Sequence, residues 1–311
     1  MKIGFDAKRA VNNMTGLGNY SRLVIESLAR RFPADRMLLY APRERENARL
    51  QPILALPNVE LHTPVAGGLF AKGALWRSWG ICSQLKADGI DIFHGLSNEL
   101  PLNIRQSGIP SVVTVHDLIF RRLPYCYSLP DRHIYNLKYG ASCRLADRII
   151  AISQRTKDDI VELFGINPDK IDIVYQGCAE TFKHTATRNQ RESVRQKYGL
   201  PQRYVLQVGT IERRKNLMLT VKALSALPAD VHLVAVGRDR GYLEGVMVEA
   251  ARTGVAGRIH ILSGVAFDEL PPIYQQAAVI AYPSRYEGFG IPVLEGLESE
   301  RPVVAATGSC L

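Results

Sequence analysis

The sequence predicts an α/β protein made of two Rossmann-like domains whose parallel sheets face each other across a cleft. Short, continuously apolar segments alternate with helix-length segments, which is typical of parallel sheets that helices cover on both faces. A polar connection without strands interrupts this alternation, and the pattern then restarts. The 311 residues also exceed what one hydrophobic core usually supports.

The first set of strand-like segments lies before the polar connection. These segments are short and apolar, and helix-length segments separate several of them. The predicted strands are 2–7, 36–41, 59–63, 90–95, 111–116, 148–153 and 170–175. They define a first domain of residues 1–177.

The polar connection runs from about Gln176 to Gln202 and is rich in Arg, Thr and Gln. A second set of predicted strands follows at 204–209, 231–237, 258–264, 278–284 and 302–306. They define a second domain of residues 178–311. In such sheets the ligand binds at the carboxyl ends of the strands, so polar residues that follow a strand are the candidates for a site.

Composition argues against several classes of protein. The five cysteines are scattered and form no Cys-x-x-Cys pair, which argues against a disulfide framework or a zinc site. No Asp-x-Asp motif is present, so no metal is expected. The net charge of +9 is spread along the chain without a nucleic-acid-binding motif, and no nucleic-acid partner is expected. The chain opens on the strand-like MKIGFDA and has no apolar run long enough to span a bilayer, which predicts a cytoplasmic protein.

A short glycine motif, Gly16-Leu17-Gly18, follows the first predicted strand. We expect it just before an amphipathic helix that begins near Asn19, where bare backbone N–H groups suit a phosphate. The motif alone also fits a plain turn. It lacks the third glycine and the ribose-binding acid of the dinucleotide fingerprint, which argues against NAD.

Two carboxylates eight positions apart flank a second glycine loop, in Glu287-Gly-Phe-Gly-Ile-Pro-Val-Leu-Glu295. Gly288 and Gly290 let a ligand approach the backbone, and Pro292 suits the first position of a helix. Because no third acid or histidine stands beside them, the two carboxylates suit the paired hydroxyls of a sugar better than a metal. The alternative is that Glu295 only compensates the dipole in a first helical turn and Glu287 is a solvated loop charge.

The stretch YPSRYEGFGIPVLEGLESERPVVAA resembles the signature region of the retaining glycosyltransferases with the GT-B fold, the group 1 glycosyl transferases. The opening MKIGFDAKRAVNNMTGLGNYSR and the phrase VGTIERRKNL look like members that build bacterial surface polysaccharides. Family members usually continue beyond the strand equivalent to 302–306. We therefore expect a chain that lacks the family's C-terminal segment and a second domain that is shortened.

The resemblance implies roles for both glycine loops. By resemblance Glu287 meets the hydroxyls of the donor sugar, and Glu295 binds the ribose. The backbone amides of Gly288, Phe289 and Gly290 line the sugar and phosphate in the same way. Gly16 and Gly18 are expected to reach toward the diphosphate and the donor sugar.

A cationic stretch, Thr210-Ile-Glu-Arg-Arg-Lys-Asn216, follows the first strand of the second domain. A diphosphate leaving group gains negative charge as its bond to the sugar breaks, so fixed cations aimed at it stabilise the transition state. The family has a closely similar Arg-Lys pair here, and the resemblance carries it onto Arg214 and Lys215. Arginine, lysine and backbone amides in place of Mg²⁺ predict a metal-independent mechanism.

His116 and Asp117 close a strand of the first domain at its expected cleft-facing end. A histidine at such a place is often structural and bonded to a backbone carbonyl. The resemblance instead places His116 beside the donor sugar, where it contacts a hydroxyl and steadies developing positive charge. Ser97, Asn98 and Glu99 follow the strand that contains His94, and with Asp117 they are the candidates for the acceptor side.

The resemblance therefore predicts a hexosyltransferase that moves a sugar, mannose foremost, with retention. The donor is GDP-mannose or a UDP-sugar, which is a substrate, so no cofactor is expected. The acceptor is a hydroxyl of a growing glycan or lipid-linked glycan, as in lipopolysaccharide synthesis. The alternatives are a non-catalytic nucleotide-sugar or glycan-binding protein and a sugar-nucleotide epimerase of related fold.

The segment FAKGALWRSWGICSQLK, residues 70–86, mixes tryptophans with basic residues. It fits an interfacial amphipathic helix and a peripheral contact with the inner face of the cytoplasmic membrane, although the core-helix alternative is the one that we favour. The alternative is a core helix with its tryptophans turned inward.

Overall fold

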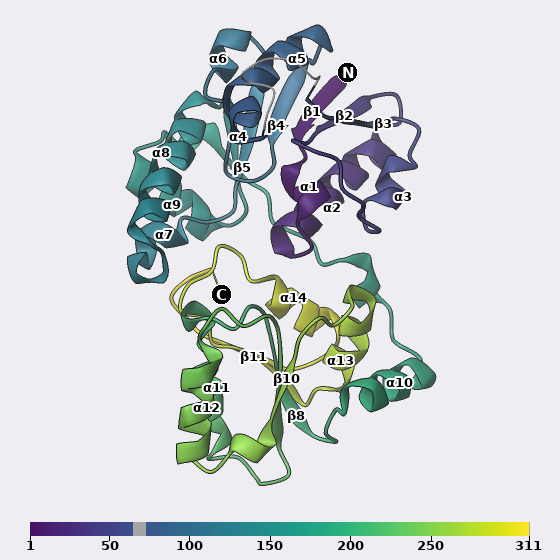
Figure 1. Ribbon diagram of the computed structural model, residues 1–311, viewed down its shortest axis with the longest axis vertical. Helices are drawn as coiled ribbons and strands as arrows, with labels where there is room; N and C mark the ends of the chain where they lie inside the picture. Colours follow the sequence, from purple (N-terminus) through teal and green to yellow (C-terminus); the bar gives the residue numbers. More distant parts are fainter. Residues whose placement is uncertain (65–72, 311) are drawn as a thin grey trace. The chain divides into compact units, whose positions relative to one another are not determined.

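A computed structural model describes residues 1–64 and 73–310. The chain divides into two compact units, Met1–Gln176 and Gly177–Leu311. Each unit contains one parallel sheet with helices packed against it, coloured purple to teal in the first unit and green to yellow in the second (Figure 1). The predicted fold class, α/β with two Rossmann-like domains, is confirmed.

The sheet of the first unit has seven strands in the order β3-β2-β1-β4-β5-β6-β7. All pairs are parallel. The strands are β1 (Lys2–Asp6), β2 (Arg36–Tyr40), β3 (Val59–His62), β4 (Ile92–Gly95), β5 (Ser111–Val115), β6 (Arg148–Ala151) and β7 (Ile171–Ile173). Each lies within one of the seven segments that the apolar pattern predicts.

Helices of unequal length connect these strands. Serine caps begin two of the longer ones, because Ser128 and Ser153 each accept a backbone N–H three residues onward. The helices are α1 (Lys8–Asn12), α2 (Gly16–Arg31), α3 (Gln51–Leu54), α4 (Gly73–Leu75), α5 (Ile81–Ala87), α6 (Ile104–Ser107), α7 (Ile119–Arg122), α8 (Leu129–Leu145) and α9 (Gln154–Phe164). A π-helical turn η1 (Trp76–Gly80) joins α4 to α5, and 3₁₀ turns form η2 (Pro124–Cys126) and η3 (Pro168–Lys170).

The second unit has a five-stranded sheet in the order β10-β9-β8-β11-β12. Its strands are β8 (Tyr204–Val208), β9 (His232–Val236), β10 (Ile259–Leu262), β11 (Val279–Tyr282) and β12 (Val303–Ala305), all parallel. Its helices are α10 (Arg188–Tyr198), α11 (Leu217–Leu224), α12 (Leu243–Arg252), α13 (Leu270–Gln276) and α14 (Ile291–Glu298), with 3₁₀ turns η4 (Glu180–Lys183), η5 (Arg213–Lys215), η6 (Ala256–Arg258) and η7 (Phe267–Glu269).

Strand order locates the expected ligand edge in each unit. The order reverses where β1 lies between β2 and β4, and again where β8 lies between β9 and β11. In open parallel sheets ligands bind outside the carboxyl ends of the strands at such a reversal. The residues after β1, β4, β5, β8 and β11 are therefore the ones to inspect.

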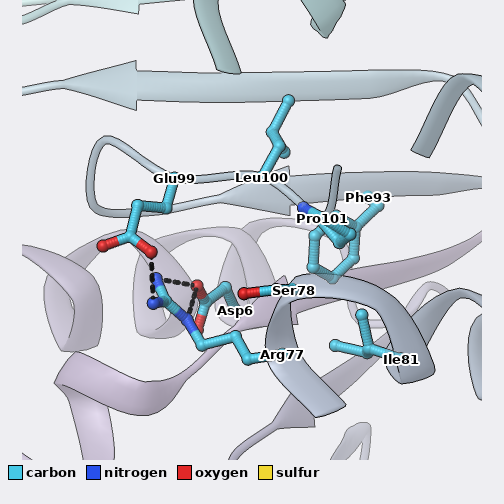
Figure 2. A pocket seen from close by; sticks show the side chains of 8 residues that line it. All are labelled: Asp6, Arg77, Ser78, Ile81, Phe93, Glu99, Leu100 and Pro101. Atoms are coloured by element: carbon cyan, nitrogen blue, oxygen red, sulfur yellow. Dashed lines mark hydrogen bonds and ion pairs between the residues drawn. The ribbon is translucent and has the colours of Figure 1, made fainter. Parts of the chain in front are cut away.

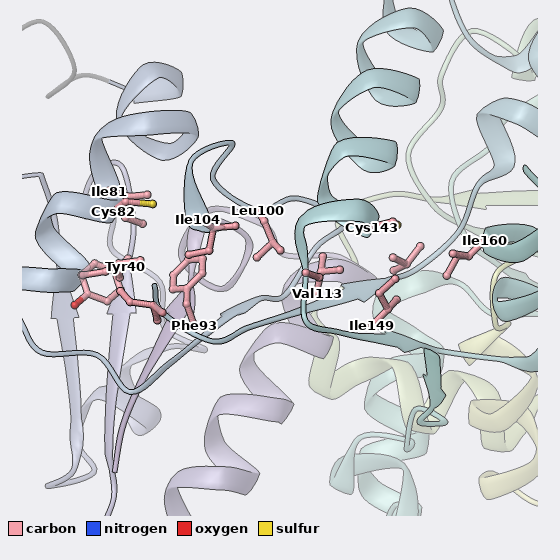
Figure 3. Packing of buried hydrophobic residues seen from close by; sticks show 14 of the residues in the cluster. Tyr40, Ile81, Cys82, Phe93, Leu100, Ile104, Val113, Cys143, Ile149 and Ile160 are labelled. Carbon is pink, nitrogen blue, oxygen red and sulfur yellow. The ribbon is translucent and has the colours of Figure 1, made fainter. Parts of the chain in front are cut away.

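Both faces of the first sheet are buried, since neighbouring residues of β2 enter different clusters. Leu38 and Tyr40 join one cluster and Met37 and Leu39 the other. Figure 3 shows the first cluster, in which strand side chains such as Phe93 face helix side chains. Its thiols are inert, because burial raises the pKa of Cys82 to about 11 and that of Cys143 to about 12.

The polar connection contains a helix that the sequence pattern does not predict. α10 (Arg188–Tyr198) begins with a capping box, in which Thr187 accepts the N–H of Gln190 and the Gln190 side chain accepts the N–H of Thr187. Its single buried residue, Val194, explains why no apolar periodicity reveals it.

Candidate functional site

Two cations and a carboxylate that are distant in the sequence meet in the second unit. Arg214 and Lys215 lie in η5 after β8, and Glu287 follows β11. Glu287 Oε1 lies 2.6 Å from Arg214 Nη1 and 2.6 Å from Lys215 Nζ. No side chain of the three is more than 14 % exposed. Because β8 and β11 are neighbours, their carboxyl ends bring these groups together.

The charges of this cluster depend on one another. Burial raises the pKa of Glu287, but the adjacent Lys215 and Arg214 more than offset burial and hold that pKa below its usual range. Burial also lowers the pKa of Lys215, and Glu287 offsets this only in part. The lysine charge is thus less well stabilised than in water, and an anionic ligand beside it would restore stabilisation.

The η5 turn is fixed from both neighbouring strands. The Gln207 side chain in β8 donates to the Lys215 carbonyl at 2.9 Å. The backbone N–H of Arg285, after β11, donates to the Arg214 carbonyl at 2.9 Å. Asn216 ends the turn with a left-handed backbone, φ 56°, which asparagine tolerates better than most residues. The two cations therefore stand on a rigid turn.

Glycines directly follow β8 and β9, where the two strand ends come close together near Lys215. A Cβ atom at Gly209 would lie 3.5 Å from Lys215 Cε, and the φ of 141° at Gly209 disfavours any side chain. A Cβ atom at Gly237 would lie only 1.9 Å from the Gly209 carbonyl oxygen. The two strand ends thus approach backbone to backbone.

Tyr282, the last residue of β11, is a member of the cluster that sequence reasoning misses. Its hydroxyl lies 2.6 Å from Lys215 Nζ, and the ammonium lies 4.7 Å from the centre of its ring. This contact holds Lys215 against the sheet by a cation–π interaction. The only signal in the sequence is an aromatic residue at the end of an apolar strand.

The second glycine loop leads directly into α14. Gly288, Phe289 and Gly290 separate Glu287 from the helix, and Gly290 has a left-handed φ of 97° that a side chain would strain. The helix begins at Ile291, so Pro292 takes its second position rather than the first.

The prediction that Glu295 lies in the first turn of the helix is wrong. Because α14 starts at Ile291, Glu295 is its fifth residue and lies in the second turn. Its Oε2 accepts a hydrogen bond of 2.6 Å from the hydroxyl of Tyr274 on α13. Burial raises the pKa of Glu295 to about 7, although the Tyr274 hydroxyl opposes the rise. A dipole-compensating role in a first turn is thereby excluded.

In the first unit, His116 is buried directly after β5. Its Nε2 lies 2.9 Å from the carbonyl oxygen of Leu96, which only accepts, so Nε2 carries the hydrogen and Nδ1 is left as an acceptor. Burial lowers the pKa of His116 to about 4, so the ring is neutral at pH 7. The histidine is bonded to a carbonyl, as in the structural alternative, yet keeps one nitrogen able to accept from a hydroxyl.

Asn98 positions the backbone of His116. Its Oδ1 accepts the His116 N–H at 2.7 Å, while its own N–H donates to the Thr114 carbonyl at 2.8 Å with a left-handed φ of 64°. Ser97 is buried beside it, and its Oγ has no hydrogen-bond partner among the described atoms. Asp117 accepts the N–H of Ile119 at 3.2 Å. Asn98, predicted on the acceptor side, thus contacts His116, predicted beside the donor sugar, directly.

Glu99, in contrast, is engaged inside the protein (Figure 2). Its Oε2 lies 2.7 Å from Arg77 Nη1 and 3.3 Å from Lys138 Nζ. Arg77 also pairs with Asp6 at the end of β1, at 2.6 Å. The cavity beside these residues has a volume of about 10 Å³, enough for about one water molecule. Glu99 therefore joins the loop after β4 to β1 through Arg77, which sequence reasoning does not assign.

The π-helical turn η1 contains Trp76, Arg77 and Trp79, so it shows which way the tryptophans of the 70–86 segment point. Trp76 is buried in the first core cluster and Arg77 is ion-paired, which favours the core-helix alternative for 70–86. Trp79 and Leu75 are exposed. Phe70 and Lys72 lie outside the described residues.

The prediction that Gly16 and Gly18 precede the helix is wrong. α2 begins at Gly16, so both glycines lie in its first turn. A Cβ atom at Gly18 would lie 1.8 Å from the carbonyl oxygen of Asn13, whereas one at Gly16 would meet nothing within 4 Å. Close packing between α1 and α2 thus accounts for Gly18, and Gly16 faces open space.

Two classes of feature are not found in the described part of the chain. No group of three or more His, Cys, Asp or Glu side chains is placed to hold a metal ion there. None of the described helices is long and apolar enough to cross a membrane.

Family models match both units. The model of glycosyltransferase family 4 matches residues 15–180, more than half of the chain, and the model of glycosyl transferases group 1 matches residues 190–310. The chain therefore belongs to glycosyltransferase family 4, and its second unit to the group 1 glycosyl transferases. The site residues Arg214, Lys215, Glu287 and Glu295 of this glycosyltransferase fall within the second match.

Its curated relatives include bacterial mannosyltransferases. The chain is 31 % identical over 228 residues to O-antigen chain mannosyltransferase B of Escherichia coli, which covers 71 % of the chain and 58 % of that relative. It is 30 % identical over 221 residues to the serotype-specific mannosyltransferase WbdA of the same species, covering 67 % of the chain and 27 % of WbdA. The chain thus spans less than two thirds of the length of either relative.

Solved structures share the fold of this glycosyltransferase. HepE from Anabaena, in complex with UDP and glucose, superposes with a TM-score of 0.74 at 20 % identity, covering 100 % of the chain and 82 % of HepE. WaaG, a glycosyltransferase involved in lipopolysaccharide biosynthesis, superposes with a TM-score of 0.71 at 20 % identity, covering 98 % of the chain and 80 % of WaaG.

Proposed function

We propose that the protein is a retaining, metal-independent hexosyltransferase that transfers a sugar from a nucleotide diphosphate sugar to an acceptor hydroxyl. The observation that carries the proposal is the cluster of Glu287 with Arg214 and Lys215 at the carboxyl ends of β8 and β11. It places buried cations and a hydroxyl-accepting carboxylate beside a glycine loop. The membership of the chain in glycosyltransferase family 4, and of its second unit in the group 1 glycosyl transferases, supports the same activity.

The cations act on the leaving group. Lys215 is under-stabilised by burial, so a diphosphate that gains charge as the glycosidic bond breaks is stabilised by it more than the intact donor is. Arg214 adds a planar fork suited to phosphate oxygens. These groups supply without a metal ion the charge that Mg²⁺ would otherwise supply.

The remaining residues orient the substrates. Glu287 accepts from the hydroxyls of the donor sugar, Glu295 from the ribose, and the amides of Gly288, Phe289 and Gly290 line the sugar and phosphate. His116, neutral and with Nδ1 available, accepts from a hydroxyl of the donor. Ser97, Asn98 and Asp117 line the acceptor side.

Mannose is the sugar we favour, with GDP-mannose as donor and a surface polysaccharide or a lipid-linked glycan as product. The names of the curated relatives support mannose, since the first two are mannosyltransferases. Because HepE was solved in complex with UDP and glucose, a UDP-sugar is the second candidate for the donor.

A thermal-shift screen of the whole chain tests donor binding. GDP-mannose, UDP-glucose, UDP-N-acetylglucosamine and the free nucleotides are compared, because a ligand that binds only the folded state raises the melting temperature. We expect one nucleotide class to raise it and Lys215→Ala to abolish the rise. No rise with any donor from a cooperatively melting sample would contradict the proposal.

Turnover with the donor so identified tests the reaction itself. We expect product with retained anomeric configuration by NMR, at a rate that EDTA leaves unchanged. Donor binding without transfer would favour a sugar-nucleotide-binding protein, and interconversion of the donor without an acceptor would favour an epimerase.

A further inference from the structure

The π-helical turn η1 binds the segment that follows β4 through its own backbone. In a π turn a backbone N–H donates to the carbonyl five residues back, and such turns occur frequently at functional sites. The Ser78 carbonyl accepts the N–H of Leu102 at 2.8 Å, and the Trp79 carbonyl accepts from the Asn103 side chain at 3.0 Å. The turn therefore holds residues 102–103 in place.

Arg77 attaches the same turn to the loop after β4 and to the end of β1 (Figure 2). Its guanidinium lies 2.7 Å from a carboxylate oxygen of Glu99 and 2.6 Å from one of Asp6. The three side chains are between 5 % and 19 % exposed, so removal of one partner would leave a shielded charge uncompensated. The cavity beside them has room for about one water molecule, which excludes a sugar or a diphosphate from it. Arg77 therefore acts on other residues of the protein.

The loop that Glu99 ends holds His116 on two sides. The carbonyl of Leu96 accepts from Nε2 of the ring at 2.9 Å, and Oδ1 of Asn98 accepts the backbone N–H at 2.7 Å. Asn98 has a left-handed φ of 64°, a conformation that most residues disfavour and that surrounding contacts must maintain. The orientation of His116 thus depends on the conformation of residues 96–99.

Backbone packing transmits a shift of Glu99 to the rest of this loop. A Cβ atom at Gly95 would lie only 2.3 Å from the Glu99 carbonyl oxygen, so the loop closes tightly on the end of β4. Leu96 and Asn98, which contact His116, lie between these two points. A displacement of Glu99 would therefore move the oxygens that hold the histidine.

We propose that Arg77 is a positioning residue for His116, which it orients by fixing Glu99 and, through Glu99, the loop of residues 96–99. The inference rests on the proposed function, in which Nδ1 of His116 accepts from a hydroxyl of the donor. Nδ1 accepts only while Nε2 keeps the ring hydrogen, and the Leu96 carbonyl enforces that tautomer. An ion pair at the end of β1 thus sets which nitrogen is available after β5.

The tautomer of His116 in the whole chain, without donor or acceptor, tests the proposal directly. Long-range proton–nitrogen NMR spectra at pH 7 distinguish a ring protonated at Nε2 from one protonated at Nδ1, and the spectrum of His116→Asn assigns the signals. The wild type should show the Nε2–H form. In Arg77→Gln we expect a mixture of both tautomers, because the loop no longer holds the Leu96 carbonyl against the ring.

Steady-state kinetics with the donor found in the thermal-shift screen measure the consequence. Turnover of Arg77→Gln should fall by about tenfold or more, because a small displacement of an orienting group is costly, while affinity for the free nucleotide is kept. Arg77→Lys keeps the charge but lacks the planar fork that serves two carboxylates, so it should recover part of the loss.

A double variant shows whether Arg77 acts through Glu99. In that case Arg77→Gln/Glu99→Gln loses no more turnover than the worse of the two single variants, since both changes break one connection. Arg148→Gln is the control, because it removes an ion pair of β6 with Asp172 of β7 instead. It should keep the tautomer and the turnover of the wild type.

Melting temperatures establish that the variants fold, and Arg77→Lys carries the spectroscopic test if Arg77→Gln does not. An unchanged Nε2–H tautomer in the folded Arg77 variant, or losses that add in the double variant, would overturn the proposal. A tautomer that changes without loss of turnover would support the positioning by Arg77 and refute the role proposed for His116. Failure of the inference is thereby distinguished from failure of the proposed function.

Discussion

Glu287, for which we propose a ligand-orienting role, also serves stability, because it is the carboxylate that Arg214 and Lys215 share. A sugar hydroxyl that approaches Glu287 meets an oxygen already held by two cations. Its position is thereby fixed before any ligand arrives, which lowers the cost of ordering the site on binding.

Removal of this charge should therefore cost both stability and turnover. Glu287→Gln keeps the shape but leaves the buried Lys215 without its ion-pair partner and Arg214 with Glu212 alone, and we expect the free energy of unfolding to fall by roughly 3 kcal/mol. Turnover should fall by about 100-fold or more, with nucleotide affinity largely kept. Urea unfolding and steady-state rates measure these effects, with the exposed Glu298→Gln as control. Equal behaviour of the two variants would refute the role given to Glu287.

Glu295 should make stability depend on pH. Its pKa is about 7 in the folded protein against an ordinary value of 4.5, so the folded state favours the protonated form. This contribution is fully present below pH 4.5 and is lost as pH rises through 7, a loss of about 3 kcal/mol. Glu295→Gln imitates the protonated acid, so its stability relative to the wild type should rise between pH 5 and pH 8.

Urea unfolding of Glu295→Gln and wild type at pH 5, 7 and 8 measures this difference. Tyr274→Phe serves as the second variant, because loss of its hydroxyl removes the contact that opposes the raised pKa. A difference in unfolding free energy between Glu295→Gln and wild type that is constant across this range would show that Glu295 is ionised throughout.

At the scale of elements, the junction of α1 and α2 has no space for a methyl group at one of its two glycines. Gly18 packs on the carbonyl of Asn13 and Gly16 faces open space, although both lie in the first turn of α2. Two glycines of one motif thus have opposite tolerance for a side chain.

Alanine at each position should separate the two. Gly16→Ala should stabilise the protein by up to about 1 kcal/mol, because alanine loses less backbone entropy in a helix. Gly18→Ala should destabilise it by about 2 kcal/mol, since its methyl group collides with backbone rather than with a flexible side chain. The melting temperatures of the two variants are compared with that of the wild type, and we expect a rise for Gly16→Ala and a fall for Gly18→Ala. A stable Gly18→Ala protein would mean that α1 moves easily.

The sequence predicts elements well where burial imposes a pattern and poorly where it does not. The twelve strands of the described residues all lie in predicted segments, because the inner strands are buried on both faces and form short, mostly apolar runs. α10 buries only Val194, so it leaves no periodic trace. α2 starts at Gly16 because Thr15 before it has an extended backbone. The residue types in Gly16-Leu-Gly-Asn19 do not show whether the helix starts before or after the glycines.

Site residues can likewise be divided into those that a local sequence pattern reveals and those that it does not. Strand ends and motif spacing mark the two loops, and the family resemblance selects Arg214, Lys215 and Glu287 within them, which the structure places in contact. Tyr282 and Arg77 escape notice, because their importance comes from tertiary partners that no local pattern encodes. Glu99 lies where predicted along the chain, yet its ion pair with Arg77 could only be seen in three dimensions.

At the scale of the whole molecule, each unit has its own sheet and its own pair of apolar clusters. Each is therefore expected to open locally with its own free energy, and a ligand that binds one unit stabilises that unit first. The proposed nucleotide contacts all lie in residues of the second unit, apart from Gly16 and Gly18.

Hydrogen exchange with and without the preferred nucleotide should reveal this asymmetry. At a free nucleotide concentration of about 100 times Kd, amides of β8 and β11 should gain about 2.7 kcal/mol of protection. Amides of β6 and β7 in the first unit should gain much less. Equal gains in both sheets would mean that the units unfold as one cooperative body, and a gain limited to the first would misplace the nucleotide site.

The backbone contact between Gly237 and Gly209 also bears on how this sequence can drift over generations. A methyl group at position 237 would meet the carbonyl oxygen of Gly209 at 1.9 Å, and position 209 combines a φ of 141° with the nearby Lys215 side chain. No compensating change elsewhere in the chain can remove a collision between two main chains. Descendants that keep β8, β9 and a lysine at position 215 should therefore keep both glycines, however much the surrounding strands diverge.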